Sequence, residues 1–148
     1  LPFADEVFDL ALATGVIEYV DARRAVAELV RVTKPGGRVI ASIPNPRAPY
    51  GMWRRHVIHR ANTALGRGES GTAHQRDPLP PARFAALLRE AGLTITGAER
   101  VNPQLALSPL DAVAPRAATA LAERLERGGG RLARAAATQV VLAATKPA

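Results

Sequence analysis

Apolar and polar positions at the start of the chain form first a run of strand length and then a helical stripe. Residues 8–14 (FDLALAT) are apolar except for Asp9, the pattern of a strand covered on both faces. They predict a central parallel strand. After a short loop, Asp21 is suited to cap the amino terminus of a helix. The apolar stripe of this helix consists of Ala25, Val26, Leu29 and Val30.

A Lys-Pro-Gly-Gly sequence at positions 34–37 predicts the end of this helix. Pro35 cannot continue the helical hydrogen bonds, and the glycines accept the positive φ that a chain reversal needs. Residues 38–43 (RVIASI) then predict a second buried strand. Because a helical crossover returns right-handed and places its two strands parallel, residues 8–43 predict a β-α-β unit.

The composition changes between residues 44 and 81, where prolines, glycines and arginines gather with all three histidines. One candidate helix lies within residues 50–65. A second helix is predicted to start at Pro80-Pro81 and to end before Gly92, a residue suited to the position after a helix. Its apolar stripe consists of Phe84, Leu87, Leu88 and Ala91.

Three further elements are predicted in the last third of the chain. Residues 93–101 alternate between apolar and polar side chains, which predicts a strand with one wetter face near a sheet edge. Residues 115–127 predict an alanine-rich helix before three glycines, and residues 138–144 (TQVVLAA) predict a last buried strand. The order β-α-β, insertion, α-β-α-β predicts an α/β fold.

A length of 148 residues with 47% hydrophobic side chains predicts one domain with its own core. No apolar run approaches the about 20 residues that span a bilayer, and no charged-then-apolar leader opens the sequence, so no membrane partner is expected. The lack of cysteine excludes a disulfide framework and a cysteine nucleophile, and it favours a cytoplasmic location. Because Leu1 stands only a few positions before the first strand, we expect a fragment.

The formal charge of +7 would suit a nucleic-acid partner, but most of the excess is local. Residues 1–46 carry five bases and six acids, residues 47–76 six bases and one acid, and residues 77–148 nine bases and six acids. Eighteen of the 20 bases are arginine, as expected from GC-rich coding DNA. No helix-turn-helix or RNA-binding signature is present, so a nucleic-acid substrate is not expected.

Two sequences near the start, LPFADEVFDLALATGVIEYV and AVAELVRVTKPGGRVIASIPNP, contain several short motifs in a specific order. LPF, then Phe-Asp opening a strand, then a Glu-Leu-x-Arg-Val helix running into KPGG and another strand, resembles the second half of a class I S-adenosylmethionine-dependent methyltransferase domain. HQRDPLPPARFAALLREAGL is similar to that family's penultimate helix-strand pair, and TQVVLAATKP is similar to its last strand.

This resemblance implies a three-layer, Rossmann-like methyltransferase fold, of which residues 1–148 form a partial domain. Residues 44–81 are expected to form the family's substrate cover, and the last strand is expected to be antiparallel. The family's glycine-rich cofactor turn and ribose-binding acid would lie upstream of Leu1. The expected order of strands across the sheet is 8–14, 38–43, 138–144 and 93–101.

The family binds S-adenosylmethionine beyond the carboxyl ends of its strands, where the strand order switches. Glu18 follows within reach of this pocket as a candidate catalytic residue, although the family usually has histidine where this chain has Tyr19. In the alternative interpretation, Glu18 and Tyr19 only tie the loop to the next helix. The residues that the resemblance places along the cofactor pocket are Thr14, Gly15, Val16 and Ile17.

Methyl transfer from a sulfonium can rest largely on positioning, but an oxygen acceptor must also lose a proton. Histidine is the side chain best suited to take it near neutral pH. His74 is the best candidate for a catalytic base, because relatives often have histidine before their penultimate helix. No carboxylate or cysteine completes a metal set beside His56 and His59, so no metal is expected.

The implied function is transfer of a methyl group to a small-molecule acceptor. Two alternatives stay open: a non-catalytic half-domain that pairs with another chain through the edge at residues 8–14, and a basic nucleic-acid-binding module. Since a partner strand for residues 8–14 and half of the cofactor pocket are lacking, we expect the chain to be inactive alone. The sequence leaves the acceptor and the oligomeric state open.

Overall fold

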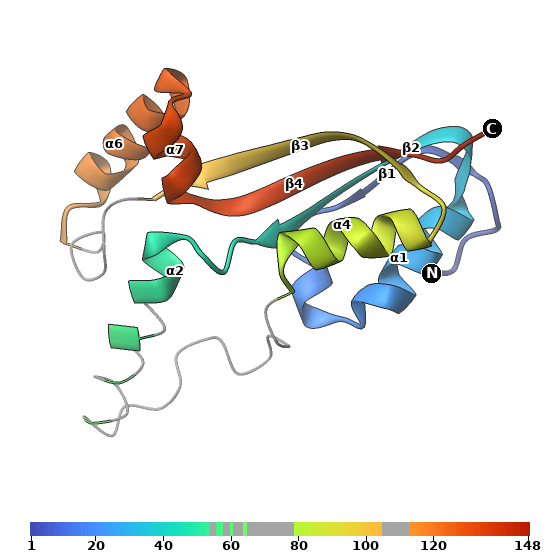
Figure 1. Ribbon diagram of the computed structural model, residues 1–148, viewed down its shortest axis with the longest axis horizontal. Coiled ribbons are helices and arrows are strands. Elements are labelled where there is room, and N and C mark those ends of the chain that lie inside the picture. Colours follow the sequence, from blue (N-terminus) through green and yellow to red (C-terminus); the bar gives the residue numbers. More distant parts are fainter. Residues whose placement is uncertain (54–55, 58–59, 61–63, 65–78, 105–112) are drawn as a thin grey trace. The chain divides into compact units, whose positions relative to one another are not determined.

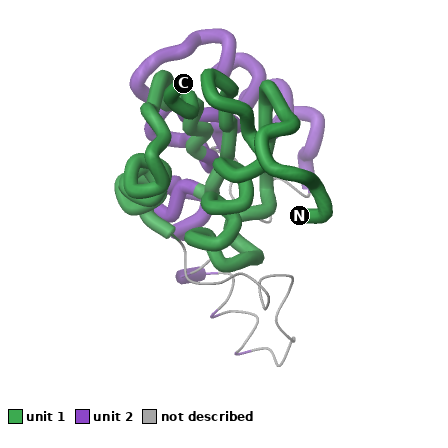
Figure 2. Tube along the Cα trace, turned by 90° about the vertical axis from the view of Figure 1, so that its right-hand side faces the viewer, with its two compact units in different colours: residues 1–44, 76–99, 140–148 green, residues 45–75, 100–139 purple. Residues whose placement is uncertain are grey.

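The computed structural model describes residues 1–53, 56–57, 60, 64, 79–104 and 113–148, and its helices and strands are drawn in Figure 1. The chain divides into two compact units, coloured in Figure 2. The first unit comprises residues 1–44, 76–99 and 140–148, and the second comprises residues 45–75 and 100–139.

The first unit opens with the predicted β-α-β arrangement. Strand β1 (Phe8–Ala13) leads through a short 3-10 helix, η1 (Ile17–Tyr19), into helix α1 (Ala22–Val32). As predicted, the side chain of Asp21 caps α1 by accepting a hydrogen bond of 2.9 Å from the Arg24 N–H. Strand β2 (Thr33–Pro44) follows and pairs with β1 in parallel, which confirms the unit.

The Lys-Pro-Gly-Gly sequence lies inside β2 and not before it, so the predicted start of this strand is wrong. Thr33 pairs with Phe8 and Arg38 with Leu10, and the residues between them leave the regular ladder. Gly36 has a φ of +76°, and its N–H donates a 2.9 Å hydrogen bond to the carbonyl of Lys146 near the end of the chain. A distant segment therefore holds this irregular stretch in the sheet, which the local pattern could not indicate.

The four strands lie in the order β1-β2-β4-β3, as predicted. Strand β3 spans Thr94–Pro103 and strand β4 spans Ala137–Thr145. Lys146, after the end of β4, bonds to the start of β2, whereas Asn45, after the end of β2, donates its N–H to the carbonyl of Thr138 at the start of β4. Because opposite ends meet, β4 runs antiparallel to β2, as the resemblance implied.

One face of the sheet carries the hydrophobic core of the first unit. Helices α1 and α4 (Pro81–Glu90) lie on that face in Figure 1. Helix α4 is the one predicted from its apolar stripe, and Gly92 follows it with a φ of +85°. The core side chains are Ala11, Ala13, Val39, Ala41, Ile43, Val140, Leu142 and Ala144 from the strands and Val26, Leu29, Phe84 and Leu88 from the helices.

Strand β1 is not covered on both faces, so this prediction is wrong. Ala11 and Ala13 are buried, whereas Leu10 is 52% and Leu12 is 62% exposed. The strand is also the first in the sheet order, so one of its edges pairs with no strand in the described part of the chain. Both faces of β1 carry apolar side chains, but the described residues bury only the face with Ala11 and Ala13.

The second unit contains helices that the sequence predicted in part. Helix α6 (Pro115–Gly128) confirms the alanine-rich helix, and Gly129 ends it with a φ of +55°. Helix α7 (Arg131–Ala136) was not predicted, because six residues are too few for a clear period. Helix α2 (Pro49–Trp53) lies where the helix within residues 50–65 was expected, and most of the remaining residues of that prediction lie outside the described ones.

Candidate functional site

The loop that follows β1 is fixed to the neighbouring strand by one hydrogen bond. The N–H of Gly15 donates to Oγ of Ser42 on β2, at 3.2 Å, and the Ser42 side chain is buried. Gly15 has a φ of +64°, a backbone conformation that other residues adopt at a cost. Apart from its neighbours in the chain, no described residue has an atom within 4 Å of the position that a Cβ would take. The backbone at Gly15 is thus held in place beside open space.

The four residues expected to line the cofactor pocket have different environments. Thr14, Gly15 and Val16 are exposed, whereas the side chain of Ile17 is buried in the core of the first unit. The N–H of Tyr19 donates to the carbonyl of Val16 at 3.0 Å and closes the turn. Ile17 therefore anchors the loop, and the exposed part of the predicted lining is Thr14 to Val16.

Glu18 follows this anchor, and one of its carboxylate oxygens is buried with no hydrogen-bond partner among the described residues. Oε2 of Glu18 makes no hydrogen bond with any described residue. Buried polar atoms in folded proteins nearly always have a hydrogen-bond partner, so a lone acceptor here calls for a donor. A ligand that carries hydroxyl or amino groups would supply this donor. A glutamate that only connected the loop to the next helix would be expected to have a hydrogen-bond partner within the chain.

The histidine candidates are not brought to this loop by any described contact. His59 and His74 lie outside the described residues, and His56 is exposed in the second unit. Asp9, at the start of β1, is exposed and pairs with Nζ of Lys34 at 3.0 Å. Among the described residues, no group of three histidine, cysteine or carboxylate side chains is placed to hold a metal ion.

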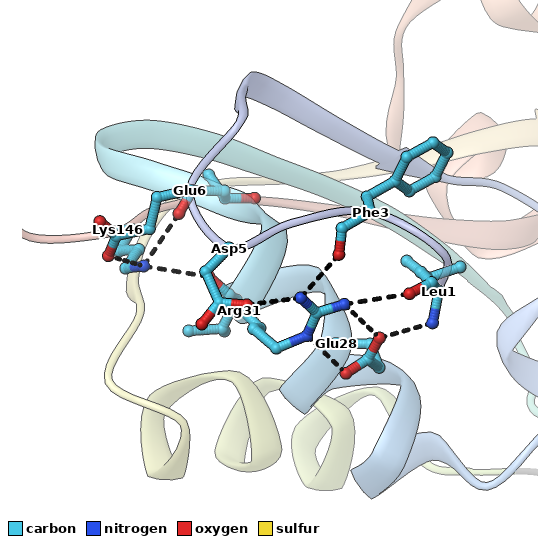
Figure 3. Close-up of polar contacts among 9 residues, drawn as sticks. Leu1, Phe3, Asp5, Glu6, Glu28, Arg31 and Lys146 are labelled. Atoms are coloured by element: carbon cyan, nitrogen blue, oxygen red, sulfur yellow. Dashed lines mark hydrogen bonds and ion pairs between the residues drawn. The ribbon is translucent and has the colours of Figure 1, made fainter.

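A network of charges that the sequence analysis missed holds the segment before β1 against α1 (Figure 3). Arg31 binds Glu28 through two hydrogen bonds of 2.8 Å, and it reaches Asp5 at 2.6 Å. The same guanidinium donates to the carbonyls of Phe3 and Leu1. Since one side chain holds three points of this segment, Arg31 fixes the direction in which the chain enters β1.

The network also sets the protonation of Glu28. The hydrogen bonds from Arg31, and then that from the Leu1 amine, lower the pKa of Glu28 from 4.5 to about 2. The Glu28 and Asp5 carboxylates raise the already high pKa of Arg31 further. Glu28 and Arg31 are thus both charged at neutral pH.

Lys146 ties the end of the chain to the same region. Its Nζ donates to the carbonyls of Val30 and Thr33 at 3.1 and 2.9 Å, and it pairs with Glu6 at 3.0 Å. The last carbonyls of a helix have no helical partner and attract positive charge. Lys146 therefore caps the carboxyl end of α1 and connects it to the segment before β1. The signal in the sequence is a lysine directly after the last strand, which is too weak to identify this role.

Comparisons with known proteins find methyltransferases that are similar to part or all of this chain. Residues 1–41 match a family model described as a methyltransferase domain. The demethylmenaquinone methyltransferase of Streptomyces griseus is 51% identical over 104 residues, which cover 62% of this chain and 45% of the relative. That of Thermus thermophilus is 32% identical over 106 residues, which cover 64% of this chain and 48% of the relative. The chain spans about half the length of these curated relatives.

A solved structure shows the same fold. It is described as an S-adenosylmethionine-dependent methyltransferase, possible histamine N-methyltransferase, from Thermotoga maritima. It matches with a TM-score of 0.60 and 19% identity, over 99% of this chain and 59% of that one. The resemblance to class I S-adenosylmethionine-dependent methyltransferases is thus confirmed, and S-adenosylmethionine is the cofactor that this family implies.

The residues of the loop fit one side of a site for this cofactor. S-adenosylmethionine carries ribose hydroxyls and amino groups, which are the donors that the lone Glu18 oxygen lacks. The open space beside Gly15 lets a ligand approach the backbone closely.

Proposed function

We propose that this chain is part of an S-adenosylmethionine-dependent methyltransferase that acts on a small-molecule acceptor. The observation that carries the proposal is the place of the family match. The matched residues 1–41 include β1, the loop with Gly15 and Glu18, all of α1 and most of β2. The match therefore covers the carboxyl end of β1, where an α/β fold binds its ligands.

The cofactor supplies a methyl group on a positively charged sulfur, and this chain's residues would position the reacting groups. Thr14, Gly15 and Val16 would lie along the ligand, while Ile17 keeps their backbone fixed through its place in the core. Glu18 would accept a hydrogen bond or a proton from the bound ligands. His74 remains our candidate for a further base, from the resemblance alone.

For the acceptor, we propose a compound related to demethylmenaquinone. Two relatives named demethylmenaquinone methyltransferase are 51% and 32% identical to this chain over more than 100 residues.

The alternative of a half-domain that pairs with another chain is favoured by one observation. Leu10 and Leu12 are exposed on β1, at the open edge of the sheet. A strand edge of this kind invites pairing with a further strand. Because Thr14 to Val16 are also exposed, residues 1–148 alone would enclose little of a ligand, and we expect weak binding and no methyl transfer.

Ultraviolet crosslinking of radiolabelled S-adenosylmethionine to the chain tests the proposed site, because it detects weak binding. Cleavage after arginine releases residues 1–23 as the first peptide, which contains the loop. We expect the label in this peptide, and we expect S-adenosylhomocysteine to compete with it.

Two matched variants control for strain in the backbone. Gly15 and Gly92 both have positive φ, and neither has an atom near the position of an added Cβ. Gly15→Ala should reduce the labelling, and Gly92→Ala should not. Label that is spread over other peptides, that resists the competitor, or that falls equally in both variants would contradict the proposed site.

A further inference from the structure

Helix α6 carries an apolar stripe that is partly exposed to solvent. Side chains three and four positions apart share one face of a helix, and on α6 these are Ala118, Leu121, Ala122 and Leu125. None of the α6 side chains is fully buried, and Leu121 is 42% exposed. Ala118, Ala122 and Leu125 are half-buried, so the described residues cover this stripe only in part and leave Leu121 at its rim in solvent.

Further large apolar side chains are exposed on the segments on either side of α6. Val113, just before the helix, is 79% exposed, and Leu132 on α7 is 71% exposed. Gly129, with its φ of +55°, turns the chain between the two helices, which lie next to each other in Figure 1. Three large apolar side chains are thus exposed within a short stretch of chain.

The polar positions of the same stretch are rich in arginine. Residues 113–136 contain five arginines and two glutamates, a net charge of +3. Arg127 pairs with Glu123 at 3.7 Å on the exposed side of α6. The other arginines of this stretch are Arg116, Arg124, Arg131 and Arg134.

We propose that α6 and α7 bind the surface of an anionic phospholipid bilayer and lie in its interface. A helix with a narrow apolar face, low overall hydrophobicity and arginines on its polar side is typical of such binding. The exposed leucines would enter the boundary of the acyl chains, and the guanidinium groups would meet the lipid phosphates. A nucleic acid would satisfy the arginines but leave Leu121 and Leu132 in water.

This proposal does not depend on the proposed enzyme function. It differs from the expectation of no membrane partner, which was based on the lack of a long apolar run. In the described residues, no helix is long and apolar enough to cross a bilayer. A helix that lies in the interface needs only one apolar face, so that criterion does not detect it.

Vesicle flotation with the full chain tests the proposal, because bound protein rises with the vesicles while aggregated protein sediments. We expect flotation with vesicles of phosphatidylcholine and phosphatidylglycerol, little flotation with phosphatidylcholine alone, and a marked loss at high salt. Flotation that is equal on both vesicle types, or absent on the anionic ones, would overturn the proposal.

Two leucines with similar exposure give a matched pair of variants. Leu132→Ser on α7 should lower the affinity for anionic vesicles about tenfold, because the leucine no longer enters the bilayer. Leu12→Ser on β1, where Leu12 is 62% exposed, should leave it unchanged. If Leu12→Ser has the larger effect, the exposed edge of the sheet binds the vesicles and the proposal is wrong.

The double variant Arg124→Gln, Arg131→Gln tests the charges separately. Neither arginine belongs to the core, so the fold should persist, as circular dichroism would verify. We expect weaker flotation and a smaller dependence on salt than in the unchanged chain. An unchanged dependence on salt would contradict a role for these arginines.

Discussion

Strands β1 and β2 have similar apolar sequences but different surroundings. Strand β2 lies between β1 and β4, and it buries Val39, Ala41 and Ile43 on its core face and Ser42 on the opposite face. Strand β1 has a described neighbour on one side only, and its leucines point away from the core while its alanines are buried. The apolar run of a strand therefore indicates which of its faces are suited to burial, but the elements packed against the strand determine which faces are buried.

This difference has a functional consequence. The loop after β1 is the one that carries Gly15 and the lone Glu18 oxygen, and it leaves the sheet at the strand with the open edge. The loop is held by the hydrogen bond from Gly15 to Ser42 on β2 and by the buried side chain of Ile17. The candidate site is thus well supported from β2 and open on the other side.

Truncation of one side chain on each strand should break the comparison most sharply. Ile43→Ala in β2 removes a side chain that is 2% exposed, and it should lower the free energy of unfolding by about 2–5 kcal/mol. Leu12→Ala in β1 should change it by less than about 0.5 kcal/mol, because Leu12 is already in water. Urea denaturation measures both, and similar losses in the two variants would mean that β1 is covered.

The crowded backbone around Gly37, in the irregular stretch of β2, should give the next largest effect. A Cβ at this position would lie 2.7 Å from Thr33 Cγ2 and 2.8 Å from the Lys34 carbonyl oxygen. Gly37→Ala should therefore destabilise the chain by about 1–3 kcal/mol. In the control Gly128→Ala at the end of α6, the added methyl group meets no atom, so stability should stay the same or rise. A neutral Gly37→Ala would show that the backbone from Thr33 to Gly37 is less crowded than these distances indicate.

Replacement of Glu18 separates a functional residue from a structural tie. We expect the buried Oε2 to gain a hydrogen-bond donor only from a bound ligand. Glu18→Met should then stabilise the free chain by about 1 kcal/mol, because the substitution removes a buried acceptor that has no partner among the described residues. The same variant should lose the label in the crosslinking experiment. Thermal unfolding gives the stability, and a clear loss of stability would favour the interpretation in which Glu18 only ties the loop to α1.

The stability that the segment before β1 contributes should depend on pH, and this effect should be smaller than those of the substitutions above. The segment before β1 depends on Glu28, whose pKa is lowered from 4.5 to about 2 by Arg31 and the Leu1 amine. The stabilisation is therefore complete above pH 4.5 and is lost as the pH falls toward about 2. Thermal unfolding of Glu28→Gln should depend less on pH in this range than that of the unchanged chain, with Glu126→Gln on α6 as control. Equal slopes for both variants would contradict the role of this network.

Most of the fold could be predicted, because it follows either from patterns among neighbouring residues or from the family resemblance. The stripe of α4 and the cap at Asp21 depend on neighbouring residues, and both are confirmed. The strand order and the antiparallel last strand followed from the resemblance. The start of β2 was missed because its irregular stretch is held by Lys146, more than 100 positions away.

The position of the candidate site is a prediction from the resemblance, and its details could not be predicted from the sequence. The resemblance placed it after residues 8–14, and the structure gives Gly15 its positive φ and open surroundings there. The division between the exposed Val16 and the buried Ile17 depends on tertiary packing, which a four-residue motif does not encode. The lack of a described hydrogen-bond partner for Glu18 Oε2 could not be predicted either, because it depends on where every nearby donor lies in the folded chain.

An NMR titration with S-adenosylhomocysteine, using the chain labelled with ¹⁵N at its 12 glycines, tests the central claim most directly. If the loop after β1 forms one side of the cofactor site, the amide signal of Gly15 shifts with a Kd of about 1 mM, as expected for a ligand bound on one side. The signals of Gly92 and Gly128, which belong to the ends of α4 and α6, stay in place. A Gly15 signal that does not move while the ligand shifts other glycines would contradict the account.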